Sequence, residues 1–259
     1  MSLAFWTYDV NAAEYREWSF GASGGRSEFS GQWDAASQIL IVRRHRPEEP
    51  SGRGAPVGYH FIGNNQIDYV GVHRTTGGSV PFEDVMSTAR KKTPQPKSLS
   101  EIPTVAGPLE EPKELVLLNK FAGEWTIHAK SKPSIWLPNG GEEMLTEKVA
   151  WILGGRYLMA RTFNEKDQLT SIWLATYEPK EQSNRFWFFN ADGSSGQWRV
   201  TWDAASRGFH WRSIDMPPGW IGTGFNRWID DDTFDNQALI KDENGRVLLD
   251  GTQDKRRKK

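Results

Sequence analysis

The sequence predicts an all-β protein in which about ten antiparallel strands form a meander barrel, preceded by a partial barrel of the same type. Three observations predict this fold: an internal repeat, a long series of short alternating segments, and many aromatic side chains. Thirteen of the 259 residues are tryptophan, and few segments show helical periodicity. Large rings on the faces of short strands favour β structure over helices.

The repeat relates the start of the chain to its end at an offset of 169 residues. Twelve of the 31 positions from 7 to 37 are identical at that offset. After a two-residue slip the offset becomes 167, and Arg90-Lys91-Lys92 match Arg257-Lys258-Lys259. Residues 1–92 therefore correspond to 171–259, a repeat that places domain boundaries. The identical residues of the first copy are Thr7, Tyr8, Arg16, Trp18, Phe20, Ala22, Gly24 and Trp33-Asp34-Ala35-Ala36-Ser37.

A proline-rich segment separates the two copies. Its composition predicts an extended linker over 93–112, between a partial barrel at 1–92 and a complete barrel at 113–259. Pro112 suits the first turn of a short helix, in which Leu115, Leu118 and Phe121 would share one face. The linker prolines are Pro94, Pro96, Pro103, Pro108 and Pro112.

From Gly123 onward, period-two segments alternate with turn residues such as Asp192-Gly193 and Asn244-Gly245. A meander of this length is expected to close into a barrel, because closure removes the exposed strand edges. The expected strands lie near 124–131, 143–152, 156–164, 170–178, 184–190, 196–203, 207–214, 220–229, 233–241 and 246–253.

One stretch resembles a known family. Leu118-Asn119-Lys120-Phe121-Ala122-Gly123-Glu124-Trp125, a short helix running into Gly-x-Trp on a first strand, resembles the opening of lipocalins and other calycins. Together with Trp151-Ile152-Leu153-Gly154-Gly155-Arg156-Tyr157-Leu158 and the hairpins at Thr176-Tyr177-Glu178 and Trp202-Asp203, it makes residues 113–259 similar to uncharacterised bacterial lipocalin-like domains of unknown function. The resemblance implies a calycin-type barrel whose lumen often holds a small apolar molecule. It implies no catalytic residue.

The strand pattern suggests which side chains face that lumen. Alternation places Arg185, Trp187 and Phe189 on one face of their strand, which we take as the inner face. An inward arginine could bind a carboxylate with two hydrogen bonds, whereas its recurrence as Arg16 in the first copy also fits a strand-bracing role. The candidate lumen residues are Trp125, Arg161, Trp173, Arg185, Trp187 and Trp202.

Composition and motifs argue against several other functions. The net charge is −1 with acids and bases mixed, so we expect no nucleic-acid partner, and the basic tail from Lys255 is expected to be a solvated end. No apolar run is long enough for a membrane span, and the first residues lack the pattern of a signal peptide. We therefore expect a soluble protein whose compartment stays open.

Metal and catalytic chemistry find little support. The chain has no cysteine, and His128 and His210 lack partners at metal-ligand spacing. Asp230-Asp231-Asp232 suits a solvated turn better than a calcium loop. No nucleophile motif is present, so the sequence favours a non-enzymatic protein without a cofactor. A barrel enzyme, or haem ligation by His210, remains an alternative.

Two functions stay open. The first is binding of a small apolar or amphipathic molecule in the lumen of 113–259. The second is a structural or interaction module, because thirteen indoles could fill both lumens. In either case the open edges of 1–92 would need completion by an upstream segment, self-association or the following barrel.

Overall fold

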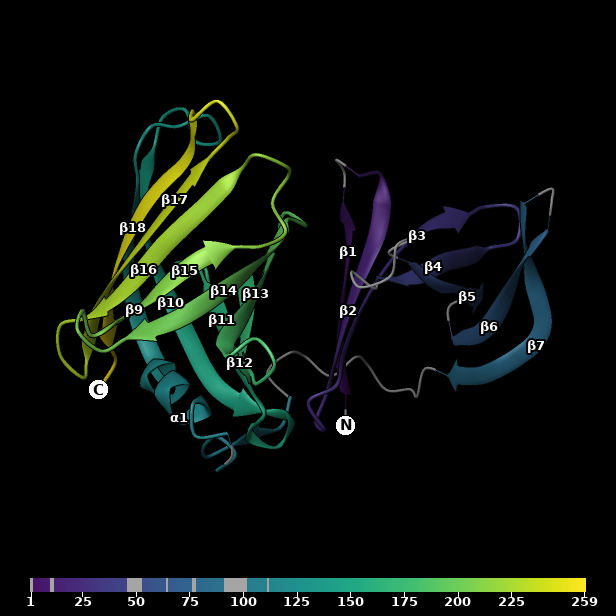
Figure 1. Ribbon diagram of the computed structural model, residues 1–259, viewed down its shortest axis with the longest axis horizontal. Coiled ribbons are helices and arrows are strands. Elements are labelled where there is room, and N and C mark those ends of the chain that lie inside the picture. The colour runs from purple at the N-terminus through teal and green to yellow at the C-terminus, as the bar shows by residue number, and fades with distance from the viewer. Residues whose placement is uncertain are drawn as a thin grey trace. The chain divides into compact units, whose positions relative to one another are not determined.

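The computed structural model describes residues 2–9, 12–45, 53–63, 65–75, 78–90, 102–110 and 112–259. The chain divides into two compact units, residues 1–102 and 103–259. Each unit contains one antiparallel sheet (Figure 1). None of the helices in the described ranges is long and apolar enough to cross a membrane.

The second unit is a closed barrel of ten antiparallel strands. Each strand pairs with its neighbour in sequence, and β18 pairs with β9 to close the ring. The predicted fold class is therefore confirmed, including the meander order of the strands. The strands are β9 (Gly123–Ser131), β10 (Gly141–Ile152), β11 (Tyr157–Phe163), β12 (Leu169–Glu178), β13 (Ser183–Asn190), β14 (Ser195–Asp203), β15 (Gly208–Ser213), β16 (Ile221–Trp228), β17 (Thr233–Lys241) and β18 (Val247–Arg257).

A short helical segment precedes the first barrel strand. It consists of α1 (Leu115–Leu118) and the 3-10 turn η2 (Asn119–Phe121). Leu115, Leu118 and Phe121 are all buried, as their spacing predicts. The apolar face of this segment therefore belongs to the core of the barrel.

Part of the predicted linker packs against the barrel. Strand β8 (Thr104–Val105) pairs with the end of β10, and the amide of Leu109 donates to the carbonyl of Gly155 at 3.0 Å. Gly155 has φ +84°, and a Cβ there would lie 2.7 Å from the carbonyl oxygen of Gly107. The 3-10 turn η3 (Leu153–Gly155) thus needs a residue without a side chain at this close approach.

Residues 103–110 of the predicted linker thus belong to the second compact unit, and Thr104, Val105 and Leu109 form backbone hydrogen bonds or strand pairing with the barrel. The backbone of Thr104 and Val105 pairs with β10 although both residues stay exposed, a pairing that composition alone could not reveal. The remaining parts of that prediction, residues 93–101 and 111, lie outside the described residues, as do Lys91 and Lys92.

The first unit is a seven-stranded antiparallel sheet in simple sequence order. Among the described residues no pairing joins β1 to β7, so the sheet curls without closing. The strands are β1 (Ser2–Asp9), β2 (Glu14–Gly21), β3 (Arg26–Asp34), β4 (Ile39–His45), β5 (Arg53–Ile62), β6 (Gln66–Thr75) and β7 (Gly78–Arg90).

The two units use the same turn after corresponding strands. β2 and β3 begin and end 169 residues before β13 and β14. Asp34 accepts a hydrogen bond from the hydroxyl of Ser37 at 2.6 Å, and Asp203 accepts one from Ser206 at 2.6 Å. Both turns place a non-glycine residue at positive φ, Gln38 at 55° and Arg207 at 52°. An Asp side chain that bonds its own turn stabilises this geometry.

Candidate ligand site in the barrel lumen

One cluster of buried side chains receives members from every strand of the barrel and therefore marks its inside. Trp125 on β9, Trp173 on β12, Phe186 on β13 and Trp228 on β16 belong to this cluster. Residues directly opposite each other in antiparallel strands project to the same side of a sheet. The strand register therefore assigns the remaining inward positions.

The helix end of the lumen is filled by aromatic rings. The ring of Phe121 lies 4.8 to 5.9 Å from five other rings, those of Trp173, Phe186, Phe209, Trp228 and Phe234. The indole of Trp125 donates to the carbonyl of Phe121 at 2.7 Å. The residue after the short helix thus closes this end of the barrel with dense packing.

A charged cluster lies inside the barrel beside these rings. The ammonium of Lys255 is 2.9 Å from Oε1 of Glu147, and both residues are buried. The other carboxylate oxygen of Glu147 accepts hydrogen bonds from the indole of Trp173 at 2.9 Å and from the hydroxyl of Thr162 at 3.1 Å. Both oxygens of the buried carboxylate are therefore satisfied, as burial of a charge requires.

Farther from the helix, two rows of inward residues cross β16, β17 and β18 in register. The first row is polar: Asn226 faces Asn236, which faces Gln253, and the amide of Asn236 donates to the side-chain oxygen of Asn226. The second row consists of small residues, Gly224, Ala238 and Gly251. On these three strands the inner wall is therefore polar near the middle, small in the next row, and apolar again beyond it, where Ile240 faces Leu249.

An aromatic wall stands next to the row of small residues. Trp211 lies directly opposite Gly224, and its ring is 5.1 Å from Phe186, 5.7 Å from Phe188 and 6.3 Å from Trp198. The indole nitrogen of Trp211 is buried and finds no hydrogen-bond partner among the described residues. A buried donor without a partner is unfavourable unless water or a ligand accepts from it.

Three of the six predicted lumen residues lie inside. Trp125 and Trp173 belong to the core cluster, and half-buried Trp202 packs against it. Arg161, Arg185 and Trp187 project to the opposite side, because their strand neighbours Ala160 and Phe186 face inward. The prediction that Arg185 and Trp187 share the inner face is therefore wrong.

Arg185 instead forms contacts on the outer side of the sheet. It donates to the side-chain oxygen of Gln197 at 2.9 Å and lies 3.4 Å from Glu181, which also contacts Arg199 at 3.1 Å. Its guanidinium lies 6.0 Å from the ring centre of Trp187. These contacts bridge β13 and β14, the strand-bracing role left open by the sequence.

Neither barrel histidine is placed to ligate a metal inside the lumen. His210 is exposed and lies 3.7 Å from Asp203, while His128 contacts Glu142 at 3.0 Å. Across the described residues, no group of three or more potential metal ligands converges. Haem ligation by His210 thus gains no structural support.

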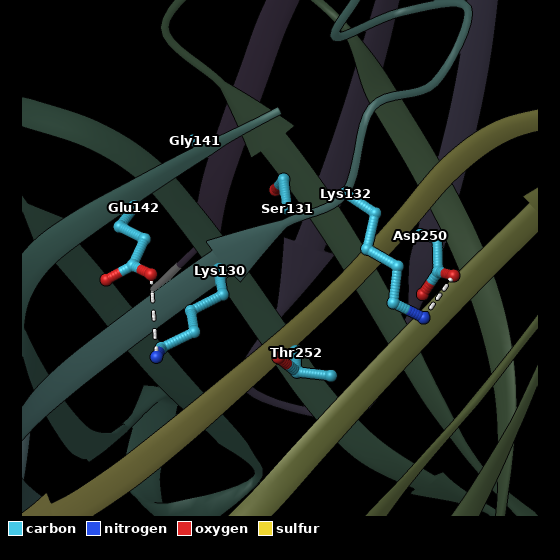
Figure 2. A pocket seen from close by; sticks show the side chains of 7 residues that line it. All are labelled: Lys130, Ser131, Lys132, Gly141, Glu142, Asp250 and Thr252. Carbon is cyan, nitrogen blue, oxygen red and sulfur yellow. Dashed lines mark hydrogen bonds and ion pairs between the residues drawn. The ribbon is translucent and has the colours of Figure 1, made fainter. Parts of the chain in front are cut away.

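The described surface of the barrel includes two depressions. The larger, about 360 Å³, lies on the outer side of β9, β10 and β18 and is crossed by ion pairs of Lys130 with Glu142 and Lys132 with Asp250 (Figure 2). The hydrogen bond with His128 and the charge of Lys130 lower the pKa of Glu142. The smaller, about 240 Å³, lies beside the helix, where Lys120 and Arg257 contribute to its lining.

The charged cluster was not found from the sequence. Lys255 begins a basic tail that we expected to be solvated, yet it is 7% exposed. Arg257 likewise stacks over Trp125, 4.3 Å from the ring centre. The sequence does contain a signal for a buried charge. Glu147 is in phase with Val149 and Trp151, so it lies on the apolar inner face of its strand.

No family model and no curated protein matches this sequence. Among solved structures, a protein of unknown function from the DUF3598 family of Nostoc punctiforme matches with a TM-score of 0.38 and 12% identity, over 99% of this chain and 88% of that one. An S-type phycobiliprotein lyase from Guillardia theta matches with a TM-score of 0.35 and 11% identity, over 54% of this chain and 90% of that one. Similarities of this size carry no functional argument, so a function can be inferred only from the residues of this chain.

Proposed function

We propose that the barrel of residues 103–259 is a lipocalin-like module that binds a small amphipathic molecule in the open part of its lumen. One observation carries the proposal: the row of small residues at Gly224, Ala238 and Gly251 lies beside Trp211, whose indole N–H lacks a partner. Small side chains leave room, aromatic rings supply apolar contact, and an unpaired donor selects an acceptor. Ligand sites in proteins commonly combine these features.

Each part of the lumen has a separate role in this proposal. The rings of Phe188, Trp198 and Trp211 would pack against the apolar body of the ligand. The indole N–H of Trp211 would donate to one acceptor atom. Asn236 and Gln253 would contact a second polar group of the ligand, because they occupy the next inward row. The closed end around Phe121 would serve as the floor.

The alternative is a structural module with a filled lumen. The dense packing around Phe121 favours it for the helix end of the barrel. The two functions differ only in the half of the lumen that Trp211 and the row of small residues line, where a side chain placed on the inner wall would block a ligand but leave a purely structural role intact.

We further propose that the first unit arose by duplication of the last seven strands of the barrel. Matching strand bounds and the shared Asp34 and Asp203 turns support this origin. The duplication would account for a sheet that curls like a barrel wall yet begins partway through the meander.

A paired substitution on β18 tests the binding function. Gly251→Phe adds a ring to the inner wall, where the nearest atom to a new Cβ is 3.6 Å away, an ordinary contact. Thr252→Phe adds the same ring to the outer face one residue along. Tryptophan quenching by a panel of lipids and retinoids gives the affinities of both variants.

We expect Gly251→Phe to weaken binding at least tenfold and Thr252→Phe to leave it within twofold of wild type. Trp211→Phe should weaken binding about two- to tenfold, the effect of one neutral hydrogen bond. Equal affinities of the two β18 variants, or no quenching by any panel member, would favour the filled module instead.

A further inference from the structure

The first unit has an aromatic face of its own. The ring of Trp6 on β1 lies 5.0 Å from that of Tyr59 on β5, although three strands separate them in the sheet. Side chains of such distant strands meet only on the side toward which a sheet curls. We call this side, which carries Trp6 and Tyr59, the inner face of the first unit.

The register places further rings on this face. Tyr69 lies directly opposite Tyr59, with ring centres 5.3 Å apart. Tyr8 and Tyr15 are likewise opposite each other at 5.0 Å. Trp6 remains 43% exposed and Tyr8 45% exposed, so these rings offer accessible surface.

A carboxylate lies among these rings. Glu17 is directly opposite Trp6 and is only 6% exposed. The hydroxyl of Tyr59 donates to its Oε2 at 3.0 Å. Burial raises the pKa of Glu17, and the hydrogen bond from Tyr59 partly offsets this effect. Burial and the nearby charge of Glu17 also raise the pKa of Tyr69.

No basic side chain among the described residues pairs with the carboxylate of Glu17. This contrasts with Glu28 on the opposite face, which pairs with Arg16. A buried anion without a cation is costly and attracts a positive charge. Aromatic faces attract cations as well, most strongly when the cation is poorly hydrated.

We propose that the inner face of the first unit binds a small organic ammonium ion, with its charge beside Glu17 and its alkyl groups against Trp6, Tyr59 and Tyr69. The edge-to-face arrangement of Trp6 with Tyr59, at 82°, presents two ring faces at a steep angle, as a partial cage for such an ion requires. This site is independent of the lumen of the second unit.

The repeat supports a distinct role for this face. At the repeat offsets, Glu17 corresponds to Phe186, Tyr59 to Asn226 and Tyr69 to Asn236. Inward residues of the barrel thus differ in chemistry from those of the first unit. A duplicated scaffold with a different inner face fits a different ligand.

The test uses the full chain and two probes of the same shape. Choline carries a quaternary ammonium, and 3,3-dimethyl-1-butanol replaces it with a neutral tert-butyl group. Calorimetric titration of each probe should show choline binding at least tenfold tighter. Equal binding of the two probes, or none of choline, would overturn the proposal.

Variants separate the charge from the rings. Glu17→Gln keeps the acceptor for Tyr59 and should weaken choline binding at least fivefold, whereas Glu14→Gln, on the other face of the same strand, should not change it. Trp6→Leu alters an exposed ring, keeps the buried carboxylate and should weaken choline binding comparably. Gly251→Phe should leave choline binding unchanged. Identical affinities of wild type, Glu17→Gln and Trp6→Leu would refute the site.

Discussion

The ion pair between Lys255 and Glu147 gives the most informative prediction for the barrel. The side chains of Lys255 and Glu147 are 9% and 3% exposed, and their charged atoms lie 2.9 Å apart. Lys255→Met removes the cation and leaves the carboxylate buried. Breaking a buried pair in this way costs about 3–5 kcal/mol in the free energy of unfolding. Urea titration followed by tryptophan fluorescence measures it, since ten of the thirteen indoles lie after residue 112.

A double-mutant cycle separates the pair from its surroundings. Glu147→Gln together with Lys255→Met should cost less than the sum of the two single changes, by about 1–3 kcal/mol, because neither charge is then left unpaired. Lys132→Met is the matched control, since Lys132 pairs with Asp250 at 2.8 Å but is 69% exposed. An exposed pair contributes about 0–1 kcal/mol. Additive losses in the cycle, or equal losses for Lys255→Met and Lys132→Met, would refute a buried pair inside the barrel.

Three further predictions concern single positions. Phe121→Ala should lower the free energy of unfolding by about 3–5 kcal/mol in a urea titration, because it empties the centre of five packed rings; a loss below about 1 kcal/mol would argue against a filled floor. Gly155→Ala should lower the melting temperature, since it forces a side chain to positive φ, while Gly107→Ala, with nothing within 4 Å, should not. Equal melting temperatures would contradict the close approach at Gly155. Glu17→Gln should raise the free energy of unfolding at pH 7, because burial raises the pKa of Glu17 and so disfavours its charged form in the folded state. The gain should shrink as the pH falls, because the folded wild-type protein then takes up the proton that removes the buried charge, and a pH-independent difference would contradict the assignment.

The strands of the barrel were largely predictable from the sequence. Alternation and turn residues such as Asp192-Gly193 mark where each strand ends, and these local signals survive folding unchanged. The helix with Leu115, Leu118 and Phe121 was predicted for the same reason. The pairing of β8 with β10 was not, because a two-residue strand in a proline-rich segment carries no periodicity.

The inward face of β13 could not be decided from the sequence. Phe186 and Phe188 lie on one side and Trp187 and Phe189 on the other, so both faces are apolar and alternation does not discriminate between them. Only the closed ring, with Phe186 in the shared core, settles the orientation. Arg185 was placed on the wrong face for the same reason, since it is in phase with Trp187.

The repeat identities also pointed away from the inner surface of the first unit. Arg16, Trp18 and Phe20 match the outward residues of β13, whereas Glu17, between them, has no identical partner. Similarity within the repeat therefore marked scaffold at these positions. The two units differ instead on their inner faces, where Glu17, Tyr59 and Tyr69 of the first unit correspond to Phe186, Asn226 and Asn236 of the barrel.

Native mass spectrometry of the full chain purified from its own source tests binding in the lumen most directly. We expect the wild-type protein and Thr252→Phe to retain a small molecule of one mass, and Gly251→Phe to retain none. A wild-type protein that carries no such mass and takes up none of the lipids or retinoids, or a Gly251→Phe variant that retains the same molecule, would contradict this expectation.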